Sequence, residues 1–223
     1  MADNTDSLLQ QPPLAIIQTD RLRLRTLQMS DLDHVMPMVT DPEVMKWTSH
    51  RPLETREQAQ KWLSDRALGA DVYNFIIELR HQTASAESTT IVGIMGCFHP
   101  PECGYMIYPE HFGKGYATEA VKGFIPAYFE RFRVDKVRGK GFDYLEACTD
   151  IENWGSMRVL EKCGFERVGQ VDKDFESPML GVRSTAFYRL PGPSRSLEEL
   201  GLVMVKASGQ MEEEEQPPQP PIQ

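Results

Sequence analysis

The chain has 223 residues, of which 40% are hydrophobic and 26% charged, and its formal net charge is -9. A chain of this length and apolar content can bury one sizeable core, so we expect a single folded domain. It contains no apolar run long enough to span a bilayer, and its N-terminus lacks the basic-then-apolar pattern of a signal peptide. These features favour a cytoplasmic protein with no membrane partner. The acidic balance also argues against nucleic acid, which calls for a clustered basic face.

Much of the acidity lies at the C-terminus. Residues 198–223 hold six Glu and one Lys, which contribute -5 of the total and leave -4 for residues 1–197. Glu212 to Glu215 precede the segment QPPQPPIQ, which has no apolar periodicity, so we expect a disordered tail within a C-terminal extension of residues 192–223. We interpret the tail as a solubilising appendage, and the alternative is a polyproline stretch that binds a partner. Residues 1–17 are expected to be a flexible segment that precedes the domain.

The N-terminal half alternates between strand and helix signals. Residues 21–26 alternate Leu with Arg or Thr, which predicts a strand with one buried face. Residues 30–39 predict a short helix that Pro37 weakens. After a linker of residues 47–52, a capping box at residues 55–58 starts a second helix that ends at Gly69. The apolar stripe of this helix consists of Ala59, Trp62, Leu63 and Ala67.

Strand signals dominate the remainder of the chain. Residues 73–80 and 90–98 are β-branched and aromatic runs that predict a hairpin with a polar loop between them. Further strands are expected over residues 103–108, 145–149, 165–171 and 185–190, and helices over residues 117–131 and 154–163. Pro126 predicts a bend near Gly123 to Pro126 in the first of these helices. The order of elements predicts an α/β fold with a mixed, largely antiparallel seven-stranded sheet flanked by about four helices.

Residues 111–118, with the sequence HFGKGYAT, lie between a predicted strand and a predicted helix. Two glycines allow close approach of a ligand, and the first turn of a helix offers amide donors and the positive end of its dipole. This segment is therefore a candidate cradle for a phosphorylated cofactor. A Walker loop is excluded because the spacing to the upstream Gly104 is wrong. The dinucleotide pattern fits poorly, because Thr118 takes the place of its third glycine.

A third pattern fits both this segment and a second one. Residues 105–120, YMIYPEHFGKGYATEA, resemble the acyl-CoA pyrophosphate loop of the GNAT N-acetyltransferases, and residues 153–165, NWGSMRVLEKCGF, are similar to the downstream N-x-x-S-x-R-V-L-x-K-x-G-F helix of that family. The resemblance is closest to the branch that acetylates ribosomal proteins and other N-terminal amino groups. With the opening sequence TDRLRLR at residues 19–25, it covers roughly residues 18 to 190.

The resemblance implies acetyl-CoA as the acetyl donor and specifies a set of residues for it. The strand before the loop is implied to offer a backbone amide to the oxyanion, the loop to bind the pyrophosphate, and Asn153 to contact the pantetheine arm, although Asn153 is also a plausible helix cap. Phe112 departs from the Gln or Arg that is frequent in the family, so amide donors must dominate. The implied cofactor residues are Tyr105, Met106, Ile107, Phe112, Gly113, Lys114, Gly115, Tyr116, Ala117, Thr118 and Asn153.

Acetyl transfer to an amine also needs a base and an acid. By resemblance, Glu102 matches a frequent base position and Ser156 the position of the acid that protonates the leaving thiolate. The alternatives are a solvated strand-end carboxylate for Glu102 and a hydroxyl bonded within its own helix for Ser156. His99 competes with Glu102 as the base. His111, beside the loop, is interpreted as a solvated histidine, and Lys114 either aids a phosphate or is a solvated side chain.

The sequence favours no metal site. Cys97, His99 and Cys103 lie on one predicted hairpin, but no fourth ligand accompanies them. The chain has four cysteines, which also include Cys148 and Cys163. They lack the spacing of a disulfide framework and are expected to be reduced core thiols.

The predicted function is acetyl-CoA-dependent acetylation of a primary amine, either a small molecule or a protein N-terminus, by direct attack in a ternary complex. The alternative is a non-catalytic module that binds acyl-CoA or another protein. The acceptor pocket is expected between the linker, the hairpin and an irregular loop of residues 172–182. The identity of the acceptor and the oligomeric state cannot be read from the sequence.

Overall fold

A computed structural model describes residues 14–69, 71–80, 89–134 and 141–203. The predictions for the N-terminal segment before residue 14, for most of the 81–89 loop and for the tail after residue 203 lie outside the described residues, and the domain boundaries stay predictions. The elements in chain order are β1 (Ile16–Gln18), β2 (Leu22–Thr26), η2 (Met29–Asp31), α1 (Leu32–Val39), α2 (Pro42–Met45), α3 (Arg56–Ala67), β3 (Tyr73–Leu79), β4 (Ile91–His99), β5 (Glu102–Ile107), η3 (Pro109–His111), α4 (Tyr116–Arg131), β6 (Tyr144–Asp150), α5 (Trp154–Lys162), β7 (Glu166–Ser177) and β8 (Gly181–Pro191).

The predicted mixed α/β class is confirmed. In the described chain, one eight-stranded sheet has the order β1-β2-β3-β4-β5-β6-β8-β7. Neighbouring strands are antiparallel except for β5 and β6, which are parallel. No helix among the described residues is both long and apolar enough to cross a bilayer.

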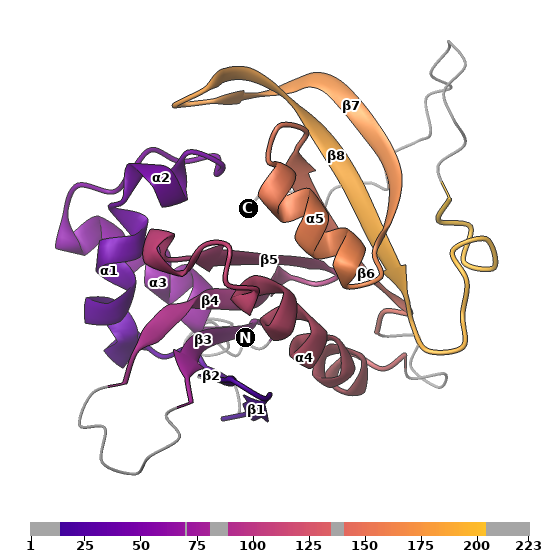
Figure 1. The fold of residues 1–223 in the computed structure, drawn as a ribbon, viewed down its shortest axis with the longest axis horizontal. Coiled ribbons are helices and arrows are strands. Elements are labelled where there is room, and N and C mark those ends of the chain that lie inside the picture. Colours follow the sequence, from indigo (N-terminus) through magenta and orange to yellow (C-terminus); the bar gives the residue numbers. More distant parts are fainter. Residues whose placement is uncertain (1–13, 70, 81–88, 135–140, 204–223) are drawn as a thin grey trace, which may run out of the picture.

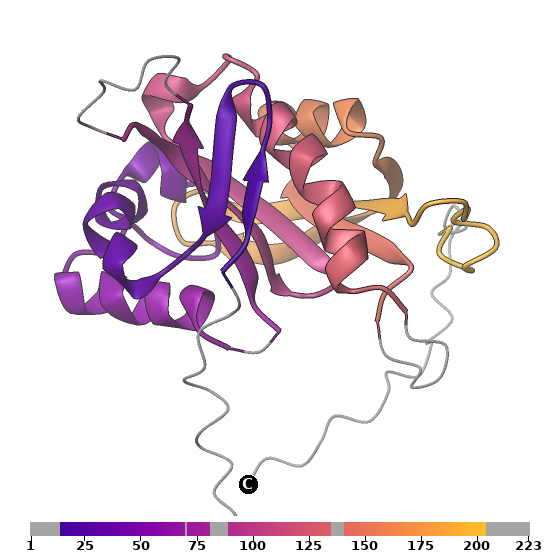
Figure 2. The same ribbon diagram turned by 90° about the horizontal axis from the view of Figure 1, so that it is seen from below.

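The sheet lies between two groups of helices (Figures 1 and 2). Helices α4 and α5 cover one face, where Leu22, Phe75 and Ile77 join a large apolar cluster with Phe124 of α4 and Leu160 of α5. Helices α1, α2 and α3 cover the other face, where alternate strand residues such as Ile76 and Ile94 contact them. The period-two pattern of the strands thus supplies both layers of the core.

The seven-strand prediction omits one edge strand. Residues 16–18 form β1, which is too short to show a periodic signal, and the Ala15 amide donates to Thr26 Oγ1 at 2.7 Å beside it. Residues 172–182, expected to be irregular, instead extend the hairpin of β7 and β8. The alternation of buried and exposed residues is absent along this part of β7 because most of its side chains are exposed, so the sequence offered no strand signal there.

The structure contains one α-helix that was not predicted. A short helix, α2, follows the first one, because Asp41 accepts a hydrogen bond from the Glu43 amide at 2.7 Å and Pro42 occupies the first helical turn. The helix predicted over residues 117–131 is confirmed as α4, which runs through Pro126 to Arg131, and the bend near Gly123 to Pro126 stays a prediction. Burial of Phe124 and Tyr128 on either side of the proline offsets the lost backbone hydrogen bond.

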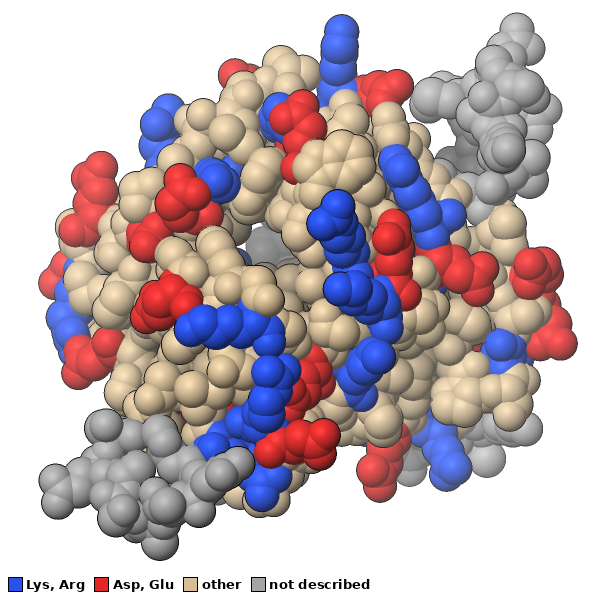
Figure 3. Space-filling model, viewed as in Figure 1, with Lys and Arg blue, Asp and Glu red and all other residues tan. Residues whose placement is uncertain are grey.

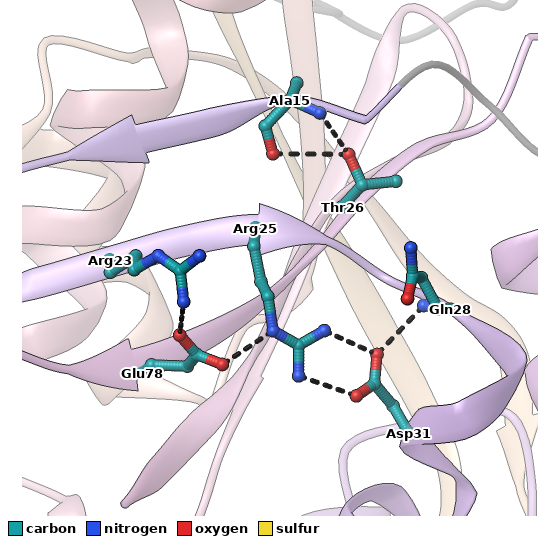
Figure 4. A network of polar contacts seen from close by, with 7 residues as sticks. All are labelled: Ala15, Arg23, Arg25, Thr26, Gln28, Asp31 and Glu78. Atoms are coloured by element: carbon teal, nitrogen blue, oxygen red, sulfur yellow. Dashed lines mark hydrogen bonds and ion pairs between the residues drawn. The ribbon is translucent and has the colours of Figure 1, made fainter. Parts of the chain in front are cut away.

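A charged network fixes the start of α1 to the sheet (Figure 4). The Arg25 guanidinium of β2 donates to Glu78 of β3 at 2.6 Å and to both oxygens of Asp31 at 2.9 and 2.7 Å. Arg23 donates to the other Glu78 oxygen at 2.9 Å, and Asp31 accepts from the Gln28 amide at 2.9 Å. Glu78 and Asp31 are only 4% and 2% exposed, so each carboxylate needs these partners.

Gly93 permits the close approach of β4 and β5. A Cβ atom at this position would lie 2.1 Å from the backbone oxygen of Met106. We therefore expect Gly93→Ala to push the strands apart and to lower the free energy of unfolding by about 1–3 kcal/mol, as overpacking does. Urea denaturation measures the loss. Gly104→Ala on the neighbouring strand is the matched control, because its Cβ would meet no atom within 4 Å. Equal stability of the two variants would contradict the prediction.

Candidate active site

Strands β5 and β6 separate almost as soon as they meet. Within the described residues, they pair at one position, Glu102 opposite Glu146, and the Glu146 amide donates to the Pro101 carbonyl at 2.9 Å. Beyond this point, the edge of β5 that faces β6 has no strand partner. The separation exposes backbone groups of an internal strand to whatever lies in the opening.

The amides of Tyr105 and Ile107 point into this opening. At the end of β5, the Tyr108 amide donates to the carbonyl of Val92 on the β4 side at 2.9 Å. Because amide directions alternate along a strand, the Tyr105 and Ile107 amides face the opposite side. The predicted pattern of backbone donors is therefore available at this edge, whereas the Met106 amide points to β4.

The loop after β5 brings more amide donors to the same region. Gly113 and Gly115 adopt φ angles of +72° and +79°, and Gly115 is the N-cap of α4. No atom lies within 4 Å of a Cβ built on Gly113, so the loop is open on that side. Both glycines have left-handed backbones, and α4 is 16 residues long, which gives the exposed loop the dipole and free amides of a helix N-terminus.

A clamp from β1–β2 holds this loop in place. Arg21 donates from Nη1 to the Lys114 carbonyl at 3.0 Å and from Nε to Glu119 at 2.6 Å, and its guanidinium lies 4.7 Å from the centre of the Tyr116 ring. Glu119 also accepts from Thr19 Oγ1 at 2.6 Å. Partial burial alone would raise the pKa of Glu119, but the bonds from Thr19 and Arg21 lower it. From the sequence, Arg21 was expected only as part of a strand and of the opening segment of the family resemblance.

Helix α5 starts on the other side of the opening. Asn153 is its N-cap and accepts a hydrogen bond from the Ser156 amide at 3.1 Å, as the capping alternative expects. Ser156 Oγ lies 2.9 Å from the Tyr105 hydroxyl, which bridges β5 and α5. The hydroxyl pair thus joins the predicted acid to the strand that carries the free amides. Cys163 Sγ, near the end of α5, contacts the Thr118 carbonyl of α4 at 3.5 Å.

The turn before Asn153 is fixed by a buried ion pair. Asp150 accepts from Arg183 of β8 at 2.6 and 2.8 Å in a bidentate arrangement, and its Oδ1 accepts from the Glu152 amide at 2.8 Å. Burial alone would raise the pKa of Asp150, but the hydrogen bonds from Arg183 and the Glu152 amide lower it. The pair orients the start of α5, and no local sequence pattern predicts it because its two members are 33 residues apart.

A cavity of about 350 Å³ adjoins β5, and neither the 111–118 loop nor α5 contributes to its described lining. The linker residues Trp47 to His50, the helix α3 and the ends of β4 and β5 line it, so the linker and the hairpin form the walls that were expected. Residues 172–182 are not among its lining residues. In Figure 3 the surface is hollowed between the α1–α2 side of the molecule and α5.

Glu102 and His99 stand at this cavity. Both side chains are exposed and belong to its lining. Although Glu102 keeps exposed surface, the partial loss of hydration raises its pKa, the Glu146 carboxylate adds to this rise, and His99 has a smaller opposite effect. A carboxylate with a raised pKa is a better proton acceptor than an ordinary one.

The remaining predicted residues divide into exposed and buried groups. Phe112 and Lys114 are exposed on the loop, with Phe112 at 52%. The solvated interpretation of His111 is wrong: the side chain is 9% exposed and packs edge-on against Tyr116, with ring centres 5.9 Å apart. Within the described chain, its Nδ1 has no hydrogen-bond partner.

The cysteines behave as separate thiols. Cys97 and Cys103 face each other across β4 and β5 in the core, whereas His99 is exposed, so the three candidate metal ligands do not converge. Cys163 is also buried. The expectation of a core thiol is wrong for Cys148, which is exposed on β6.

Comparisons with known proteins agree with this geometry. A family model described as an acetyltransferase (GNAT) domain matches residues 21–166. The uncharacterized N-acetyltransferase p20 of Bacillus licheniformis is 27% identical over 170 residues, which cover 72% of this chain and 86% of that protein. The structure of a GNAT-family acetyltransferase from Bacillus anthracis superposes with a TM-score of 0.63 at 22% identity, over 79% of this chain and 98% of that one.

The structure of RimL, a ribosomal L7/L12 α-N-protein acetyltransferase in complex with coenzyme A, has a TM-score of 0.62 at 13% identity, over 80% of this chain and 98% of that one. At this identity the likeness establishes the fold. The family model covers well over half of the chain, so the protein belongs to the GNAT acetyltransferases. It is a GNAT-type N-acetyltransferase, as its relatives and the family model show.

Gly115 tests the cradle directly. Gly115→Val forces a β-branched side chain into a left-handed backbone at the N-cap of α4, and we expect it to lower the affinity for coenzyme A at least about tenfold, measured by calorimetry. Gly181→Val is the matched control, because Gly181 has a φ of +74° but lies at the start of β8, outside the 111–118 loop. Equal coenzyme affinity of the two folded variants would contradict the role of the loop.

Proposed function

We propose that the protein transfers an acetyl group from acetyl-CoA to a primary amine. The observation that carries this proposal is the unpaired edge of β5, because it lies between a candidate phosphate cradle and a cavity with a carboxylate at its mouth. The structure thus offers separate places for a donor and an acceptor on the two sides of one strand. Such an arrangement supports direct attack in a ternary complex.

The cradle residues fit a pyrophosphate. The loop amides around Gly113 and Gly115 and the start of α4 would hold it, and acetyl-CoA supplies the activated acetyl group as a thioester. Figure 3 shows Lys and Arg side chains over α5 and the adjoining α4. These helices carry exposed Arg158, Lys162 and Lys122, whose charges favour a ligand with phosphates. The exposed Phe112 offers no polar contact, so the amides dominate the binding.

Backbone donors on β5 would stabilise the oxyanion. The Tyr105 and Ile107 amides point into the opening and have fixed directions, so they need no reorganisation when charge develops. An amide lost from such a site typically lowers kcat by about 10²–10³. The substitution of a side chain cannot remove these donors, except by proline, which has no backbone N–H.

Glu102 would accept the proton of the amine, directly or through water. The demand on this base depends on the acceptor. An α-amine with a pKa of about 7.8 loses its proton readily at neutral pH, whereas a lysine side chain with a pKa of about 10.4 does not. The raised pKa of Glu102 improves its match to either group. His99 remains a second base candidate at the same cavity.

Ser156 would hold the proton that the leaving sulfur requires. Its Oγ is 2.9 Å from the Tyr105 hydroxyl. Burial raises the pKa of Tyr105, against the opposite effect of the Ser156 hydrogen bond, so this phenol retains its proton and can reprotonate Ser156. The amide of Ser156 bonds to the cap residue Asn153 at the same time, because the amide and the hydroxyl are separate groups.

A thiol-release assay with acetyl-CoA and a panel of primary amines tests the function. We expect release that depends on the amine, together with acetylated product in mass spectra. Calorimetry with coenzyme A is run on the same preparation. Coenzyme binding without any amine-dependent release would instead identify a non-catalytic acyl-CoA-binding module.

The pH profile tests Glu102. We expect kcat/KM to rise with pH as Glu102 loses its proton, with a midpoint above the ordinary value of a glutamate, and to rise again as the amine deprotonates. Glu102→Gln should remove the first rise. Glu146→Gln should move it to lower pH, because a neighbouring negative charge is removed. A first rise that survives in Glu102→Gln would assign the base to another group.

Two variants test the proton donor. Ser156→Ala should lower kcat by about 10²-fold, the usual range for loss of a general acid, and leave coenzyme affinity within about threefold. Tyr105→Phe keeps the Ser156 hydroxyl and should have a smaller effect on kcat. A Ser156→Ala enzyme with unchanged kcat in single-turnover experiments would show that Ser156 only stabilises the first turn of α5.

A further inference from the structure

The candidate acceptor cavity contains two side chains of opposite charge. Among the described residues that line it, Arg66 on α3 and Glu102 on β5 are the only ones of the Asp, Glu, Lys and Arg types. The remainder of the lining is mainly aromatic, aliphatic or small, including Trp47, Trp62 and Phe98. Glu102 has a role in the proposed function, whereas Arg66 has none there.

Arg66 is held by aromatic rings. Its guanidinium lies 4.0 Å from the centre of the Trp62 ring and 4.9 Å from that of Phe98. Trp62 precedes it by one helical turn, and Phe98 comes from β4. Stacking on these rings leaves the edge of the guanidinium, with its N–H donors, free to bind a ligand.

The donors of Arg66 are mostly unused within the described chain. Nη1 donates to the Trp62 carbonyl at 3.2 Å, which occupies one of the five N–H groups. No described carboxylate forms an ion pair with Arg66. The adjacent Asp65 instead pairs with Lys61 at 3.4 Å on the outer side of α3. By contrast, Arg25 and Arg183 each bind a buried carboxylate.

A partly buried guanidinium without a counter-charge is costly unless a ligand satisfies it. Arg66 is half-buried, and the loss of hydration lowers its pKa against a small opposite effect of Asp65, although an arginine stays charged at any physiological pH. The other half-buried arginines of the sheet each form an ion pair with an acidic residue, so structural arginines in this fold have a counter-charge. They are Arg23, Arg25, Arg183 and Arg189.

We propose that Arg66 binds an anionic oxygen group of the acceptor, a carboxylate, so that the amine substrate is an amino acid or a peptide with an acidic group near its N-terminus. The inference rests on the proposed function and deepens it. In this arrangement the acceptor lies across the cavity with its amine towards Glu102 and its carboxylate towards the fork of Arg66, which matches carboxylate geometry. A volume of about 350 Å³ suits a small ligand or the first residues of a peptide.

The same charges disfavour other acceptors. A polyamine would bring a second positive charge to Arg66, where no described carboxylate could compensate it. A neutral amine would leave the guanidinium unsatisfied. The acceptor preference should therefore follow the charge of the substrate end that is remote from the amine.

The test is a panel of acceptors in matched pairs. The free amino acid arm compares serine with serinamide, and the peptide arm compares N-terminal Ser-Asp with Ser-Asn peptides that have amidated C-termini; spermidine represents the polyamines. We expect the acidic member of a pair to have a kcat/KM about ten- to hundredfold higher, as a charge-assisted hydrogen bond provides. The arm with the larger ratio identifies the source of the carboxylate.

Variants of α3 then assign the preference to Arg66. Arg66→Gln should lower kcat/KM for the acidic member by the same ten- to hundredfold and leave the neutral member within about threefold. Arg66→Lys keeps the charge without the fork, so its kcat/KM for the acidic member should lie between those of the unmodified protein and Arg66→Gln. Lys61→Gln removes one positive charge from the exposed side of the same helix and should leave kcat/KM unchanged for both members of the pair.

Ligand-observed NMR with the same pairs, in the presence of coenzyme A, measures binding without turnover. If the acidic members bind and Arg66→Gln abolishes their binding while no acetyl transfer occurs, the proposed function fails and the inference about Arg66 stands. Transfer to neutral amines or spermidine at least as fast as to acidic ones overturns the inference while the acetyltransferase proposal stands. An equal loss for both members in Arg66→Gln, or no preference in binding and transfer, also overturns it.

Discussion

The architecture depends on the separation of two parallel strands. Glu102 and Glu146 form the one pair between β5 and β6 in the described chain, and the strands then diverge in the middle of a sheet. Backbone amides at such a position must find partners, because a buried donor without one costs free energy. Antiparallel pairing on both flanks holds the other strands together, so within the sheet the gap lies between β5 and β6. In the proposed function, a ligand in the gap would complete the hydrogen bonding of β5.

Residues far apart in the sequence keep the gap open and aligned. On one side, Arg21 and Glu119 join the start of β2 to the first turn of α4, and on the other, Asp150 and Arg183 join the end of β6 to β8. The Tyr105 hydroxyl connects the two sides through Ser156. Each contact links different elements, and the charged ones have at least one partly buried partner, so they resist solvent better than exposed ion pairs.

The sequence predicted those parts of the fold and site that local backbone chemistry determines. The 111–118 loop and the 153–165 helix were placed correctly because glycines, a cap and apolar periodicity define them without reference to distant residues. Strand β1 was missed because three residues hold no periodicity, and the tip of β7–β8 because its side chains lack a buried face. Arg66 was missed although it follows the buried Trp62 by four residues and so shares its side of α3. His111 was misjudged because burial depends on Tyr116 packing.

The two halves of the site use different chemistry, which explains this difference in predictability. The donor side consists mainly of backbone amides and left-handed glycines, so its recognition leaves a motif that is readable in one segment. The acceptor side consists of side chains from the linker, α3, β4 and β5, which meet only in the folded chain. The linker and α3 are separate elements from β5, so their side chains can change without altering the β5 backbone. In the proposed function, the charge and shape of this second wall would therefore set the acceptor selectivity, while the acetyl-donor chemistry proposed for the first wall would remain the same.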